Sequence, residues 1–143
     1  MKITYLLLFI ILFTSAGYTC QKSSDNKGIN SNFNYNNSSY KSILPFSKLE
    51  ASKNFNIEEA NFEVQIKDII LIAKEHAKKI DSIAKWSVES VGLYKYNYSS
   101  CNYWYYQVNL SANNPGNNYL YLNLGLNGEK PDIYKINEVL ISN

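Results

Sequence analysis

An alternation of apolar and polar residues between positions 103 and 126 is the strongest pattern in the chain. Every second residue from 104 to 110 is apolar or aromatic, and leucines repeat this spacing from 120 to 126. A period of two is typical of strands with one face on a core and the other in water. The pattern predicts two neighbouring strands that share an apolar face made of Trp104, Tyr106, Val108, Leu110, Leu120, Leu122, Leu124 and Leu126.

A three- and four-residue spacing of apolar side chains runs through residues 62–83 and predicts an amphipathic helix. Asn56, followed three residues later by Glu59, has the spacing of a capping box, so the helix is expected over residues 57–85. Such a helix would be about 40 Å long, whereas an eight-residue strand covers only about 27 Å. We therefore expect the helix to overhang the sheet, to bend, or to begin later than its cap.

Further strands are predicted on both sides of the alternating segment. Residues 86–98 form the first strand, and a turn at 99–102 places Cys101 at an exposed tip. Asn127-Gly128 is a strong tight-turn signal. Residues 132–142 fit a strand or a helix, and we favour a fourth strand that pairs back on the third.

One long helix followed by a three- to four-stranded antiparallel sheet is an α+β two-layer domain, expected here over residues 45–143. This order of elements resembles the cystatin-like architecture, which implies the same fold. Cystatin protease inhibitors carry a Gln-x-Val-x-Gly hairpin, but Gln107-Val108-Asn109 lacks the glycine and lies within a strand. The resemblance therefore does not support protease inhibition by that route.

The first 19 residues have the layout of a secretory signal. Lys2 precedes an apolar run at 3–13, and small residues follow at 14–17. The run is far shorter than the ~20 residues that span a bilayer. Residues 20–44 are rich in Asn and Ser, and we expect them to form a disordered tether.

Cys20 ends the segment Gly17-Tyr18-Thr19-Cys20, which resembles the lipobox of bacterial lipoproteins. The following Gln21-Lys22-Ser23-Ser24-Asp25 is similar to the export signal of Bacteroidota surface lipoproteins. The resemblance implies lipid attachment at Cys20 and a place at the outer membrane or cell surface. The alternative is ordinary cleavage after Gly17, which gives a soluble periplasmic or secreted protein in which Cys20 and Cys101 form a disulfide.

Charge and composition narrow the function. The net charge is +2 and all 14 basic residues are lysines, so nothing indicates a nucleic-acid interface. His76 is the one histidine, and we expect a hydrogen-bonded core histidine or one at the edge of the core rather than a buried switch or a ligand. With no catalytic constellation, no metal-ligand spacing and no phosphate loop, the sequence predicts no enzyme, metal or cofactor.

The outward positions of the second and third strands are rich in tyrosines and amides, which suit either a docking face or plain strand packing. We expect a protein partner there, with the chain acting as an accessory or immunity-type inhibitor. A glycan on the same tyrosines is the alternative, and a lipid carried between helix and sheet is a third possibility. The candidate binding residues are Tyr103, Tyr105, Gln107, Asn109, Tyr119, Tyr121 and Asn123.

Overall fold

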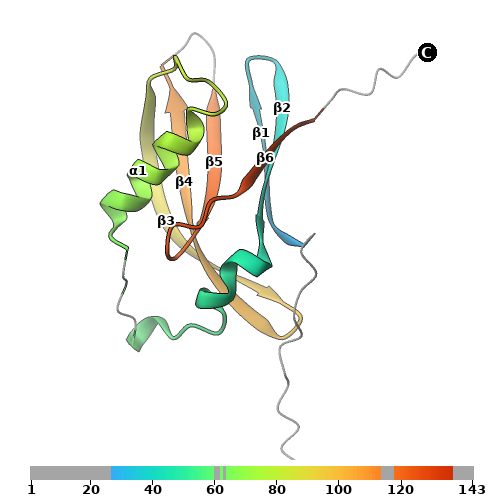
Figure 1. Ribbon diagram of the computed structural model, residues 1–143, viewed down its shortest axis with the longest axis vertical. Helices are drawn as coiled ribbons and strands as arrows, with labels where there is room; N and C mark the ends of the chain where they lie inside the picture. The colour runs from blue at the N-terminus through green and yellow to red at the C-terminus, as the bar shows by residue number, and fades with distance from the viewer. Residues whose placement is uncertain (1–26, 60–61, 63, 114–117, 137–143) are drawn as a thin grey trace, which may run out of the picture.

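The computed structural model describes residues 27–59, 62, 64–113 and 118–136 (Figure 1). These residues form two three-stranded antiparallel sheets, one in the order β1–β2–β6 and the other in the order β3–β4–β5. The strands are β1 Gly28–Tyr35, β2 Ser38–Pro45, β3 Trp86–Tyr98, β4 Cys101–Ala112, β5 Tyr119–Gly125 and β6 Asp132–Ile136. The helices are the α-helix α1 Ile66–Ala77 and the 3-10 helices η1 Phe46–Ser52 and η2 Ile57–Glu59.

The helix α1 is much shorter than the apolar spacing predicts, with 12 residues instead of the expected segment 57–85. Asn56 caps only η2, where its Oδ1 accepts the backbone N–H of Glu58 at 3.2 Å. Beyond α1, the Asp81 carboxylate accepts the backbone N–H groups of residues 83 and 84 at 2.9 and 3.0 Å, in place of helical hydrogen bonds. The prediction of an α+β, cystatin-like layer with one long helix on a single sheet is therefore wrong. The described fold is mainly β.

The hairpin β1–β2 occupies most of the segment that was expected to be a tether. Asn36 and Asn37 have φ angles of 46° and 58°, the left-handed conformation that a two-residue hairpin turn requires and that Asn tolerates. Ile29, Phe33 and Tyr35 are buried on one face of β1. Burial of these side chains offsets the entropy of ordering an Asn- and Ser-rich chain. The tether prediction for 20–44 is wrong from residue 28 onward, and residues 1–26 lie outside the described part.

The hairpin β3–β4 turns through Ser99 and Ser100, whose φ angles are 46° and 63°. Strand β4 therefore begins at Cys101, which is 1% exposed, so the prediction of an exposed tip is wrong. The antiparallel pairing of the two alternating segments is confirmed, because Val108 lies opposite Leu122.

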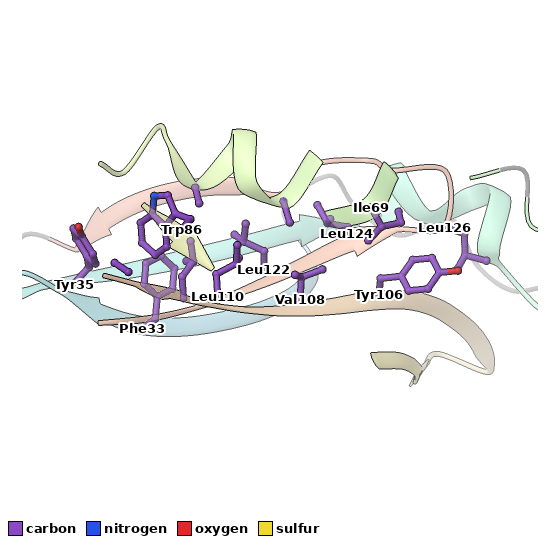
Figure 2. Close-up of a cluster of buried hydrophobic side chains, with 14 residues drawn as sticks. Phe33, Tyr35, Ile69, Trp86, Tyr106, Val108, Leu110, Leu122, Leu124 and Leu126 are labelled. Atoms are coloured by element: carbon purple, nitrogen blue, oxygen red, sulfur yellow. The ribbon is translucent and has the colours of Figure 1, made fainter. Parts of the chain in front are cut away.

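The main core lies on the apolar face of β3–β4–β5, where side chains of α1 and, from β1, Phe33 and Tyr35 pack against it (Figure 2). Ile69 and Ala73 of α1 are fully buried, as is Leu122. Trp104 is half-buried against this core and donates its indole N–H to the Phe55 carbonyl at 3.1 Å. The shared apolar face of the two alternating segments is therefore buried as predicted, but a 12-residue helix and strand β1 cover it in place of the expected long helix.

A second core covers part of the opposite face of the same sheet. Phe46 of η1 is 2% exposed, and its ring centroid lies 4.6 Å from that of Tyr103 and 4.8 Å from that of Tyr98. Leu44 and Leu49 complete this cover near the β3–β4 turn. The outer face of the sheet is therefore covered near the β3–β4 turn.

Strand β6 is a strand, as favoured, but it pairs with β2 instead of β5. Figure 1 shows it leaving the end of β5 and crossing to the other sheet. The turn before it contains Gly128 at a φ of 81°, with its N–H bonded to the Gly125 carbonyl at 3.0 Å. The predicted pairing of β6 back on the third strand is wrong, and residues 137–143 lie outside the described part. No helical segment within the described ranges is both long enough and apolar enough to cross a membrane.

Candidate functional site

The outer face of β3–β4–β5, which points away from α1, carries the residues selected from the sequence. Tyr105 lies opposite Tyr94 of β3, and Asn109 lies opposite Tyr121 of β5. Tyr119 and Tyr121 are 45% and 39% exposed, and Tyr105, Gln107 and Asn109 are half-buried. Five of the seven selected residues therefore reach solvent on one face.

The two remaining selected residues, Tyr103 and Asn123, are fully buried. The ring of Tyr103 lies beneath η1. Asn123 joins the two sheets: its Oδ1 accepts Gln107 Nε2 at 3.2 Å and its Nδ2 donates to Ser31 Oγ at 2.7 Å. The strand period placed both residues on the correct face, but it contained no signal that β1 and η1 would cover them.

The side-chain amide of Asn109 is hydrogen-bonded through its nitrogen but not through its oxygen. Its Nδ2 donates to Ser90 Oγ at 2.7 Å, while its buried Oδ1 has no hydrogen-bond partner among the described residues. A buried carbonyl oxygen without a donor costs roughly 1–3 kcal/mol. A donor brought by a bound partner would remove that cost.

Tyr94, which the sequence placed in a strand but not in the site, belongs to the same face. It is 46% exposed, and its ring centroid lies 5.9 Å from that of Tyr105. Burial raises the pKa of the Tyr105 phenol, so this side chain is neutral at physiological pH. We call the following residues the open tyrosine face: Tyr94, Tyr105, Gln107, Asn109, Tyr119 and Tyr121.

Charge is scarce on this side of the sheet. Along the described strands β3, β4 and β5, the outward positions hold Glu89 as their one charged side chain, at a bulge where it accepts a hydrogen bond from the Ser111 hydroxyl. The face therefore combines aromatic area and amide groups with little net charge.

A pocket of about 580 Å³ lies on the other side of the sheet, between the start of α1 and β3. Its lining is mostly apolar and includes Phe62, Ile66, Val91, Leu93 and Tyr106. The third function considered from the sequence, a lipid held between helix and sheet, would use this pocket.

His76 is buried, and within the part of the chain that the structure describes it lacks the hydrogen bonds that were expected of a core histidine. It is 4% exposed, and neither ring nitrogen has a hydrogen-bond partner among the described residues. Burial, together with the charge of Lys79, lowers the pKa of His76 below its ordinary value of 6.5. Within the described ranges no three His, Cys, Asp or Glu side chains gather as a metal site would require.

Comparison of the chain with known protein families, with characterised proteins and with solved structures finds no match.

Proposed function

We propose that this protein is an exported binding domain that docks a protein partner on its open tyrosine face. The observation that supports the proposal is the group of solvent-accessible tyrosines on three adjacent strands, exposed on β3 and β5 and half-buried on β4, with Glu89 as the one outward charge along these described strands. Interface cores are enriched in tyrosine and depleted of charged residues. Tyrosine also supplies a large contact area with few rotatable bonds to immobilise on binding.

A protein partner fits this face better than a glycan, because the side-chain amides of the face already donate hydrogen bonds within the protein. Gln107 donates to Asn123, and Asn109 donates to Ser90. A sugar is recognised through many directional hydrogen bonds, whereas a protein interface needs only about one per 100–200 Å². The glycan remains the alternative, since the tyrosine rings offer stacking surfaces to either ligand.

Export is part of the proposal. Whether Cys20 carries a lipid or a disulfide decides whether the exported protein is anchored to a membrane. Cys101 is disulfide-bonded, and Cys20 is the sequence's one other cysteine. A sulfur in a disulfide is not available for the thioether of a lipid anchor. Lipid attachment at Cys20 and a disulfide at Cys20 therefore exclude each other, and the two forms of the exported protein remain alternatives. Mass spectrometry of the purified, unreduced protein separates a diacylglyceryl Cys20 from a disulfide.

The binding test uses the double variant Tyr105→Ala, Tyr121→Ala beside the control Tyr134→Ala. Tyr134 lies on β6 and is 54% exposed, so its truncation removes a surface tyrosine from the other sheet. Partners are captured by cross-linking in the cell-envelope and culture fractions and are identified by mass spectrometry. The double variant should reduce capture at least about tenfold, since loss of interface tyrosines commonly costs 2 kcal/mol or more.

Circular dichroism must show that the double variant is folded. Capture that survives in the double variant but is lost in Tyr134→Ala would refute the proposal. Retention on polysaccharide columns that depends on the same two tyrosines would support the glycan instead.

A small lipid carrier is the second candidate, and the apolar pocket favours it. Ile66 at the start of α1 is 57% exposed at the edge of that pocket. Replacing it with Asp should abolish binding of a fluorescent fatty acid while leaving partner capture unchanged. A fatty acid that binds both forms equally excludes this pocket.

A further inference from the structure

A second pocket, of about 530 Å³, lies between the end of α1 and strand β6. Its position reflects the crossing of β6 to the first sheet (Figure 1), which brings Tyr134 and Lys135 beside β2 and the helix. The pocket does not share a residue with the open tyrosine face, so an inference drawn from it is independent of the proposed docking function. Its lining residues include Tyr40, His76, Lys79, Ile80, Ile133 and Lys135.

The most deeply buried polar side chain among the residues that line this pocket is His76. Burial of the ring, more than any neighbouring charge, lowers its pKa, and a backbone contact with Pro131 opposes this, although neither ring nitrogen reaches the geometry of a full hydrogen bond with any described residue. The imidazole is therefore neutral at physiological pH and has one N–H donor and one lone-pair acceptor. Both lack a partner among the described residues, which is rare for a side chain that is 4% exposed.

Positive charge converges on the same pocket. Lys79 and Lys135 line it, and Lys130 and Lys48 are close enough to lower the pKa of His76 further. The acidic side chain of the lining, Asp132, is held by Lys48, with an Nζ–Oδ1 distance of 3.1 Å. The charges of Lys48 and Asp132 cancel each other, so the net positive charge of the lining comes from Lys79 and Lys135 and the pocket favours an anion.

The rest of the lining is apolar or aromatic. Ile80 and Ile133 come from opposite sides, and Tyr40, Pro131 and Tyr134 add flat surfaces. Pockets of 300–1,000 Å³ with an apolar wall and a few convergent polar groups are typical of small-molecule sites. A bare inorganic anion would leave this apolar wall in contact with water.

We propose that this pocket binds a small organic carboxylate with an apolar body. The N–H of His76 donates to one carboxylate oxygen, the ammonium groups of Lys79 and Lys135 balance the negative charge, and the apolar body packs between Ile80 and Ile133. The carboxylate thereby supplies the acceptor that the buried imidazole lacks inside the protein.

The chain suits a direct test because His76 is its one histidine. The ring signals of the 13C,15N-labelled full-length mature protein are followed by NMR as phenylacetate or hexanoate is added. The neutral amides phenylacetamide and hexanamide serve as matched ligands, and inorganic phosphate serves as the bare anion. Either acid should shift the His76 signals saturably with a Kd of about 1 mM or tighter. The amides and phosphate should each bind at least about tenfold more weakly.

Variants identify the charges responsible. Lys79→Gln and Lys135→Gln should each weaken binding of phenylacetate about fivefold, the effect of roughly 1 kcal/mol from one lost ion pair. The control is Lys67→Gln, an exposed lysine at the opposite end of α1, which should leave the affinity unchanged. These lysine variants keep His76 as the reporter, so the test does not depend on a histidine variant that folds.

Several results would overturn the proposal. His76 signals that stay unmoved by both acids would show that neither acid binds beside the imidazole. Amides that bind as tightly as the acids would exclude recognition of the carboxylate. Phosphate that binds as tightly as the acids would show that the apolar body of the ligand contributes no affinity. An equal loss of affinity in Lys67→Gln would show that the overall charge of the protein, and not Lys79 or Lys135, attracts the acid.

Discussion

Replacement of Phe46 by Ala tests the most unexpected contact of the fold, the packing of η1 on the outer face of the second sheet. Phe46 is 2% exposed, and its ring lies against three tyrosines with centroid distances of 4.6 to 5.8 Å. If these contacts hold the end of the β3–β4 hairpin in place, their loss should destabilise the whole domain rather than a local segment.

The magnitude follows from burial. Truncation of a buried Phe to Ala typically costs about 3–5 kcal/mol, because transfer energy is lost and a cavity remains. That is a large part of the roughly 5–15 kcal/mol by which a domain is stable. Phe46→Leu keeps most of the apolar volume and removes only the ring–ring contacts, so we expect it to cost about 1–2 kcal/mol.

Urea denaturation followed by tryptophan fluorescence measures both variants, and Ile83→Ala provides the baseline. Ile83 is 91% exposed, so its truncation should change the free energy of unfolding by less than about 0.5 kcal/mol. A Phe46→Ala cost below about 1 kcal/mol, close to this baseline, would refute the reasoning, because a fully buried ring cannot be removed so cheaply. A Phe46→Leu cost near zero would show that ring stacking contributes nothing.

Three further results are expected. Asn123→Ala should lower the free energy of unfolding by about 1–3 kcal/mol in urea titrations, because it leaves Gln107 and Ser31 without their partner; a neutral result would mean that the two sheets do not depend on this bridge. Gly128→Ala should cost about 1 kcal/mol by the same assay, since Ala is strained at a φ of 81°, and unchanged stability would contradict the left-handed turn. Burial lowers the pKa of His76, so below pH ~6.5 the unfolded chain binds a proton at this residue more readily than the folded chain does. The contribution of His76 to the free energy of unfolding should therefore be constant above pH ~6.5 and fall below it. His76→Gln should flatten that slope, and a slope that persists would assign it to other groups.

Local sequence determined the strands β4 and β5, their shared apolar face and the identity of the outward side chains. Strict alternation of Val108 and Leu110 with amides leaves one way to bury the apolar set in a sheet. The same alternation placed the candidate tyrosines on one face before any contact was known. The tight turn at Gly128 was also recognisable, because few residue types adopt a positive φ.

The helix was overestimated for an equally local reason. Apolar spacing over 62–83 reports which residues share a face, but it does not weigh the competing backbone bonds that the Asp81 carboxylate makes beyond α1. The hairpin β1–β2 was missed in turn because its inward face holds only Ile29, Phe33 and Tyr35 among many polar residues. Such a sparse stripe is stable only against the preformed core of another sheet.

Tertiary structure alone decided which side of each strand is covered and by what. A period of two states that Tyr103, Asn123 and Tyr121 share a face, yet η1 buries the first, β1 contacts the second, and the third remains in solvent. The same holds for His76, whose unpaired nitrogens and neighbouring lysines depend on where β6 crosses. These outcomes rest on contacts between residues far apart in sequence, and no short-range pattern encodes which distant segment will supply the cover.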